Sequence, residues 1–170
     1  MRALQRALRS AMFDRKVNTE LFFDSDATAD AVLLVSAIAT TVYLGAVIRG
    51  PRGLSLIGLL EGVIFALIAW LIMSGGTWIA ATKLLEGDGQ LQTMMRLHGH
   101  AELPLVLGLL GSVGAVVGLV WSIAAKVPAT SEASSLDTAK SLAAVLVGLA
   151  LVVLVRLIFR LPFMAFSALL

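Results

Sequence analysis

The sequence contains no cysteine and few charged residues, and both shortages narrow what the protein can be. Without a thiol among 170 residues, disulfide bonds, thiolate metal sites and cysteine nucleophiles are excluded. Charged residues make up 14% of the chain, against about a quarter in soluble domains, whereas 59% of its residues are hydrophobic. A net charge of only +2 argues against nucleic acid as a partner. This composition is typical of a chain whose main partner is the lipid bilayer.

The hydrophobic residues gather in long runs that predict membrane-spanning helices. The runs cover residues 28–48, 54–85, 105–127 and 139–159. Each run is long enough, as a helix, for a hydrocarbon core about 30 Å thick. The third run is ambiguous, because it forms either one helix or a short helix to Leu110 and a second from Val113. We expect an all-α transmembrane bundle with five spans, the third short or re-entrant, and four spans as the alternative.

The first 25 residues predict a cytoplasmic arm in front of a transmembrane domain of residues 26–170. The arm lacks the apolar stretch of a cleavable signal peptide and has the pattern of a basic amphipathic helix. Arg2, Arg6 and Arg9 line one side, which predicts either contact with anionic lipid at the membrane surface or packing of the arm on its own bundle. Five of the thirteen basic residues fall within the first sixteen positions, so we expect a cytoplasmic N-terminus and a multi-pass protein of the cell (inner) membrane. The other lysines and arginines do not distinguish four spans from five.

Glu61 and Arg156 are charged residues inside apolar runs, where an unpaired charge is costly. Counting along the helices places Glu61 roughly 10 Å below the membrane surface and Arg156 roughly 22 Å along the last helix. With five spans the two residues reach nearly the same depth, and with four they lie in opposite halves of the membrane. The sequence therefore predicts an intramembrane ion pair, with a proton or cation site at Glu61 as the functional alternative.

His98, His100 and Glu102 follow one another closely and resemble a loose set of metal ligands, with Asp88 as a further oxygen donor. Residues two apart on a helix point to different sides, which argues against a shared ion. We favour polar residues at the headgroup boundary as their explanation and expect no cofactor.

Small residues four apart occur in three separate runs, as Gly58 with Gly62, Gly114 with Gly118, and Ala144 with Gly148. Such pairs allow helix backbones to approach closely inside a membrane. Packing within the bundle is the favoured interpretation, and an association face for another protein or a second copy is the alternative.

Three stretches, in order and spacing, carry a resemblance to a known family. They are Phe13-Asp14-Arg15 through Glu20, Asp24 and Ala27-Thr28; Gly76-Thr77-Trp78 through Lys83-Leu84-Leu85 to Arg96-Leu97-x-Gly99-x-Ala101-x-x-Pro104; and Trp121 through Glu132-Ala133 to Thr138-x-Lys140-x-Leu142. Together they are similar to the bacterial branch of the Yip1 family, small five-span membrane proteins. The distance from Pro104 to Trp121 is shorter than two full helices need, which is why we expect a stub or re-entrant third span.

The resemblance implies a non-enzymatic membrane protein. Eukaryotic members of the family act in vesicle trafficking with small prenylated GTPases and with one another. Bacterial members have no established activity that the resemblance could imply for this chain. We therefore expect no GTPase partner on the basis of the resemblance. We expect a membrane organising or scaffold component that binds another membrane protein or itself through helix faces. The alternative is a small-solute or ion transporter that uses Glu61 and Arg156. The sequence contains no Ser-His-Asp set, HExxH motif or P-loop that would indicate an enzyme.

Overall fold

The computed structural model describes residues 2–50 and 53–167, with side chains described through residue 158. Helices account for every regular element within these ranges, which confirms the all-α fold. In chain order they are α1 (Arg2–Ala11), α2 (Arg15–Phe23), α3 (Ala27–Arg49), α4 (Leu56–Ile79), the π-helical turn η1 (Ala80–Leu84), α5 (Leu91–His100), the 3-10 helix η2 (Leu103–Leu110), α6 (Ser112–Ser134) and α7 (Thr138–Ser167).

Four helices are long and apolar enough to cross a membrane. They are Ala27–Arg49, Leu56–Leu84, Ser112–Ser134 and Thr138–Ile158. The third apolar run is divided at Gly111, whose φ of +94° is one that glycine adopts readily, and α6 begins at the next residue. Because η2 has only eight residues, five spanning helices are not confirmed, and four are allowed.

The segment between α4 and α6, which we call the return segment, consists of α5 and η2. It runs beside α3 in the same direction, since Gly99 of α5 lies against Ala31 and Leu109 of η2 lies against Gly45. The break between α5 and η2 comes at Ala101 and Glu102, just before Pro104, which cannot donate a backbone hydrogen bond to an α-helix that would continue there.

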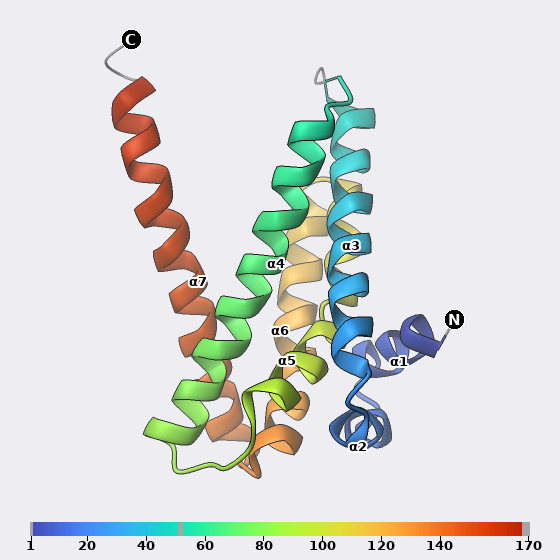
Figure 1. Cartoon of the computed structure of the whole chain (residues 1–170), viewed down its shortest axis with the longest axis vertical. Helices are drawn as coiled ribbons and strands as arrows, with labels where there is room; N and C mark the ends of the chain where they lie inside the picture. The colour runs from blue at the N-terminus through green and yellow to red at the C-terminus, as the bar shows by residue number, and fades with distance from the viewer. Residues whose placement is uncertain (1, 51–52, 168–170) are drawn as a thin grey trace.

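After Gly111 the chain reverses, and α6 packs antiparallel to η2. Gly118 of α6 lies against the backbone of Pro104, while Gly114, one turn earlier, lies against Leu107. As a result α4 and α6 run the same way, and the return segment lies between them in the chain (Figure 1). The loop that contains residues 51 and 52, which lie outside the described residues, joins α3 to α4 at the other end of the bundle.

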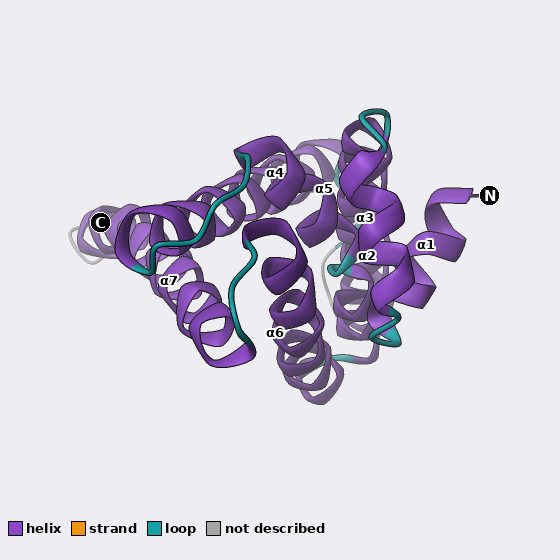
Figure 2. Cartoon of the chain, turned by 90° about the horizontal axis from the view of Figure 1, so that it is seen from below, coloured by secondary structure: helices purple, strands orange, loops and turns teal. Residues whose placement is uncertain are grey.

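We call the two ends of the bundle the arm end and the far end. The arm end contains α1, α2 and the loops of residues 85–90 and 135–137, and the far end contains the connection between α3 and α4 (Figures 1 and 2). The largest buried cluster lies toward the arm end, where Leu21, Met94 and Leu97 are at most 1% exposed. Packing is therefore densest toward the arm end of the bundle.

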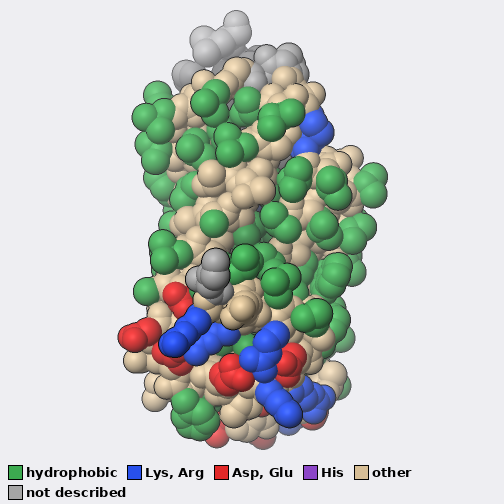
Figure 3. Space-filling model, turned by 90° about the vertical axis from the view of Figure 1, so that its right-hand side faces the viewer, with side chains coloured by type: hydrophobic (Ala, Val, Ile, Leu, Met, Phe, Trp, Pro, Cys, Tyr) green, Lys and Arg blue, Asp and Glu red, His purple; other side chains and the backbone are tan. Residues whose placement is uncertain are grey.

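Many side chains on the long helices are both apolar and exposed on the surface of the protein. Ile64 and Phe65 of α4, Val120 of α6 and Leu154 of α7 are all more than half exposed. On one face of the molecule, charged side chains form a band near the arm end, and hydrophobic side chains cover most of the region above it (Figure 3). This separation of polar and apolar surface is what a bilayer requires of the helices that cross it.

The N-terminal arm packs onto the bundle instead of extending away from it. Ala7, Val17 and Leu21 are fully buried, and the indole nitrogen of Trp121 on α6 donates a 2.8 Å hydrogen bond to the carbonyl of Ala11. Helix α1 lies across the direction of the long helices (Figure 1). The structure describes the expected arm except for Met1, and the expected transmembrane domain except for residues 51, 52 and 168–170.

Candidate functional site at the arm end

A buried ion pair joins the return segment to α6. Nζ of Lys126 lies 3.1 Å from Oε1 of Glu102, and the two side chains are only 4% and 10% exposed. Ser122, one turn before Lys126, accepts a hydrogen bond from the lysine and donates one of 3.3 Å to the other oxygen of Glu102. A buried charge is stable only when it is paired and hydrogen-bonded, so these three side chains form one unit.

This unit was not predicted from the sequence. Glu102 was expected only as a metal ligand, and Lys126 was not among the candidate site residues. The available signal was Lys126 itself, a lysine within a run of apolar residues, since such a charge in a membrane protein requires a partner.

The two histidines of α5 are buried and point to different sides. Nε2 of His98 lies 2.9 Å from the hydroxyl of Thr130 on α6, and Nδ1 of His100 lies 2.9 Å from the carbonyl of Arg96. Both side chains are 0% exposed, so the protein itself encloses them. Asp88 is exposed in the 85–90 loop.

The structure does not assemble the metal-ligand set that the sequence offered. Across residues 2–50 and 53–167, no group of three or more histidine, aspartate or glutamate side chains could hold a metal ion. Each of the four members has another contact or position: His98 with Thr130, His100 with the carbonyl of Arg96, Glu102 with Lys126, and Asp88 in the exposed loop.

A hollow of about 570 Å³ lies between α2, α5 and the end of α6. Its lining residues are Thr19, Phe22, Phe23, Asp88, Gly89, Gln90, Thr93, Arg96, Glu132, Ala133 and Ser135. Thr19 of α2 donates a 2.8 Å hydrogen bond to Oε1 of Glu132 on α6, which holds one wall together. Arg96 is 7% exposed, and its guanidinium donates to the carbonyl of Gln92 and the hydroxyl of Thr93. The sequence analysis did not single out this residue.

Glu61 and Arg156 do not form the predicted ion pair. Helices α4 and α7 pack antiparallel with Gly76 against Gly148, and this register puts Arg156 opposite Ile68, roughly 10 Å along α4 from Glu61. The two helices also diverge toward the far end (Figure 1). Both side chains are exposed, and among the described residues neither forms an ion pair.

The predicted pair relied on membrane entry points that were counted along the sequence. Leu56–Leu84 has 29 residues, so α4 with η1 is about 44 Å long and exceeds a core of about 30 Å. Glu61 instead lines a second hollow, of about 760 Å³, beside Tyr43 and Gly58 at the far end.

The glycine pair on α6 allows the return segment to pack closely. A methyl group on Gly114 would collide with the carbonyl oxygen of Leu107, and one on Gly118 with the carbonyl oxygen of Pro104. Both glycines are thus used inside the bundle, which is the interpretation that the sequence favoured.

The other two pairs of small residues differ from each other. Ala144 is fully buried, and Gly148 lies against α4, so this pair also packs inside the bundle. On α4, Gly58 lies against the ring of Tyr43, whereas nothing lies within 4 Å of a methyl group placed on Gly62. Of these six small residues, Gly62 is the one that faces open space.

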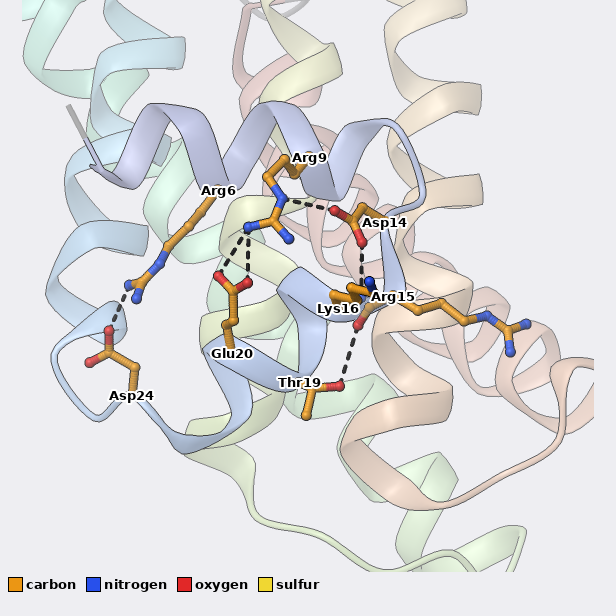
Figure 4. A network of polar contacts seen from close by, with 8 residues as sticks. All are labelled: Arg6, Arg9, Asp14, Arg15, Lys16, Thr19, Glu20 and Asp24. Atoms are coloured by element: carbon orange, nitrogen blue, oxygen red, sulfur yellow. Dashed lines mark hydrogen bonds and ion pairs between the residues drawn. The ribbon is translucent and has the colours of Figure 1, made fainter.

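Two arginines of the arm form ion pairs within the arm (Figure 4). Arg6 lies 2.6 Å from Asp24, and Arg9 lies 2.8 Å from Asp14 and 3.0 Å from Glu20. The hydrogen bond from Arg9 lowers the pKa of Asp14 below its ordinary value, and that from Arg6 does the same for Asp24. Arg6 and Arg9 are therefore paired with carboxylates of the arm. Of the three arginines predicted to contact lipid, Arg2 has an exposed side chain and no ion pair among the described residues.

Helix α1 carries an exposed apolar stripe. Leu4 and Leu8, with Met12 just beyond the end of the helix, follow one another four residues apart and are 51%, 48% and 65% exposed. A helix that lies across the bundle at the arm end with such a stripe has the geometry of an interfacial helix, whose contact with lipid is apolar.

The long apolar helices, the paired charges buried among them and the amphipathic arm define a class: a multi-pass helical membrane protein. A comparison with protein families identifies the family within this class. The Yip1 domain matches residues 12–159, and the chain therefore belongs to the Yip1 family. Comparisons with curated proteins and with solved structures found no match. The matched region begins at the end of α1 and includes both Glu102 and Lys126.

Proposed function

We propose that the protein is a non-enzymatic membrane organising or scaffold component that associates, through helix faces, with another membrane protein or with a second copy. The observation that supports this most directly is the exposure of Glu61 on α4 and Arg156 on α7. Both lie in apolar helices, and neither has an ionic partner among the described side chains.

Charges that face lipid are costly, by about 2.5–3.5 kcal/mol for a central lysine, arginine or aspartate on insertion scales. A neighbouring helix that offers the opposite charge removes that cost. Because this chain exposes one charge of each sign on two helices that diverge, a partner that contacts both helices can satisfy both groups. A second copy of the chain has the required acid and base.

The proposed topology has five crossings, with the broken return segment as the third. The parallel course of this segment along α3, from Ala31 to Gly45, supports it. The arm end then lies in the cytoplasm of a bacterial cell, consistent with the basic arm, and the C-terminal end of α7 lies on the other side. The order of sequence motifs supports membership in the bacterial branch of the family.

Association is tested on protein purified in a mild detergent and in lipid nanodiscs, by native mass spectrometry. The wild type is expected as a discrete homomer or heteromer. Glu61→Arg and Arg156→Glu each weaken it by placing like charges together. Lys140→Gln, which removes an exposed charge at the arm end, is the matched control and leaves assembly intact.

The double variant Glu61→Arg/Arg156→Glu separates the two kinds of partner. In a homomer the exchanged charges again face opposite charges and assembly recovers, whereas a heteromer stays weakened. A wild-type monomer in both detergent and nanodiscs contradicts the proposal.

The second candidate function is transport of a small solute or ion, favoured by the hollow of about 760 Å³ that Glu61 lines. Flux in proteoliposomes that Glu61→Gln abolishes would support it. Absence of flux for the common inorganic cations would leave the scaffold role.

A further inference from the structure

We propose that the hollow between α2, α5 and α6 at the arm end binds a zwitterionic phosphate–amine group, the chemistry of phosphoethanolamine. The phosphate is held by Arg96, and the amine faces Glu132 and Asp88. This site is separate from Glu61 and Arg156, so it and the scaffold role can fail independently.

The guanidinium of Arg96 is nearly buried and has no counter-ion among the described side chains. The residue is 7% exposed, yet its two hydrogen bonds, of 3.3 and 3.0 Å, go to the neutral acceptors Gln92 O and Thr93 Oγ1. Among the described side chains it forms no ion pair, in contrast to Arg6, Arg9 and Lys126. A guanidinium has five N–H donors, so several are free for a ligand in the adjoining hollow. A phosphate is the group that matches their fork geometry.

The start of α5 adds to the attraction for an anion. Helix α5 has ten residues and begins beside the hollow at Leu91, and Gln90 before it gives no side-chain cap to the free backbone N–H groups. Such a helix start carries partial positive charge and favours phosphate. The hydroxyl of Thr93, which is 3% exposed, lines the same wall.

The carboxylates of the hollow select against a simple anion. Glu132 is half-buried, and only its Oε1 is engaged, by Thr19, while Asp88 is exposed. Both repel a bare phosphate that approaches Arg96. A ligand that carries a cationic amine next to its phosphate turns this repulsion into attraction, so the charges of the lining are complementary to a zwitterion.

A phosphoethanolamine group has two sources, a phospholipid headgroup or a free small molecule. Phe22 and Phe23 line the hollow, their ring centroids are 5.0 Å apart, and Phe23 is 80% exposed. This apolar surface next to a charged hollow favours a ligand with an attached hydrocarbon chain, hence the headgroup of a phosphatidylethanolamine.

The test uses the full chain purified in detergent. O-phosphoethanolamine is titrated calorimetrically, and in parallel the protein is placed in nanodiscs of mixed phosphatidylethanolamine and phosphatidylglycerol, with retained lipid read by native mass spectrometry. Binding of the free compound identifies a soluble ligand, and retention of phosphatidylethanolamine alone identifies the headgroup. Either result supports the site.

Arg96→Gln is expected to weaken binding roughly tenfold or more, because it removes a charge-assisted hydrogen-bonding group. Lys83→Gln removes an exposed cation at the same end that does not line the hollow, and it should leave binding unchanged. Glu132→Gln should reduce the preference for phosphoethanolamine over glycerol phosphate. If Arg96→Gln does not fold, Arg96→Lys, which keeps the charge, takes its place and should bind more weakly than the wild type.

Three results overturn the proposal. One is a wild type that neither binds the free compound nor retains phosphatidylethanolamine above its share of the nanodisc. The second is equal loss of binding in Arg96→Gln and Lys83→Gln, which would indicate attraction by net charge alone. The third is an unchanged ligand preference in Glu132→Gln.

Discussion

Lys126 of α6 and Glu102 of the return segment meet inside the bundle, with 3.1 Å between Nζ and Oε1. The pair lies where the chain turns from α5 into η2, and α6 packs along η2 from this point. It therefore fixes the position of the broken segment against a long helix, in a place where each charge depends on the other for its stability.

Lys126→Met leaves Glu102 buried without its partner, and we expect a loss of about 3–5 kcal/mol of stability. The double variant Lys126→Met/Glu102→Gln removes both charges and should recover most of that loss. The measurement is thermal unfolding in detergent, followed by tryptophan fluorescence, with Lys83→Met as an exposed control. Equal melting temperatures for Lys126→Met and the control would show that the pair does not stabilise the fold.

Gly118→Val tests the close packing of η2 on α6. The added side chain meets the backbone of Pro104, so we expect a destabilisation of about 1–3 kcal/mol from overpacking. Gly62→Val is the matched control, because nothing lies within 4 Å of a methyl group at that position. Thermal unfolding of both variants under the same conditions decides the point, and two equal melting temperatures would contradict the observed contact.

The ion pairs of the arm predict a dependence on acid pH. Since arginine hydrogen bonds lower the pKa values of Asp14 and Asp24 below 3.8, the carboxylates contribute stability above that pH. The contribution is lost as the pH falls through the lowered pKa values. Because these pairs join α1 to α2 and to its flanking residues, we expect α1 to stay docked at pH 5 and to loosen below about pH 3.8.

A fluorophore on Met12→Cys measures this docking. The neighbouring Ala11 accepts a hydrogen bond from Trp121, so the indole should quench the label while the arm is docked. Trp121→Phe gives the unquenched reference. Asp24→Asn should weaken docking at pH 5 and reduce its change with acid. A quenching signal that stays constant from pH 7 to pH 3 would show that the arginine pairs do not hold the arm.

Hydropathy predicted the long helices because the cost of burying peptide groups in hydrocarbon is local and depends only on run length and composition. The run at residues 28–48 corresponds to α3, and the run at residues 139–159 corresponds to most of the described part of α7. The position of the break at Gly111 could also be foreseen, because glycine is the residue that readily takes a positive φ between two helices.

The partners of the charged groups could not be foreseen, because they depend on how helices pack in three dimensions. Counting residues placed Glu61 beside Arg156, but the register of α4 on α7 is set by the contact of Gly76 with Gly148. Likewise, nothing in the spacing of Glu102 and Lys126 along the chain indicates that the return segment brings them together.

The measurement that tests the transmembrane arrangement most directly is labelling of single cysteines, which a chain without cysteine permits. Gly53→Cys, Asp88→Cys and Leu170→Cys are exposed to an impermeant maleimide in intact cells and in inside-out vesicles. If the return segment crosses the membrane, Gly53→Cys and Leu170→Cys react in intact cells, and Asp88→Cys reacts only in the vesicles. Reaction of Leu170→Cys from the same side as Asp88→Cys would contradict the crossing and leave four spans.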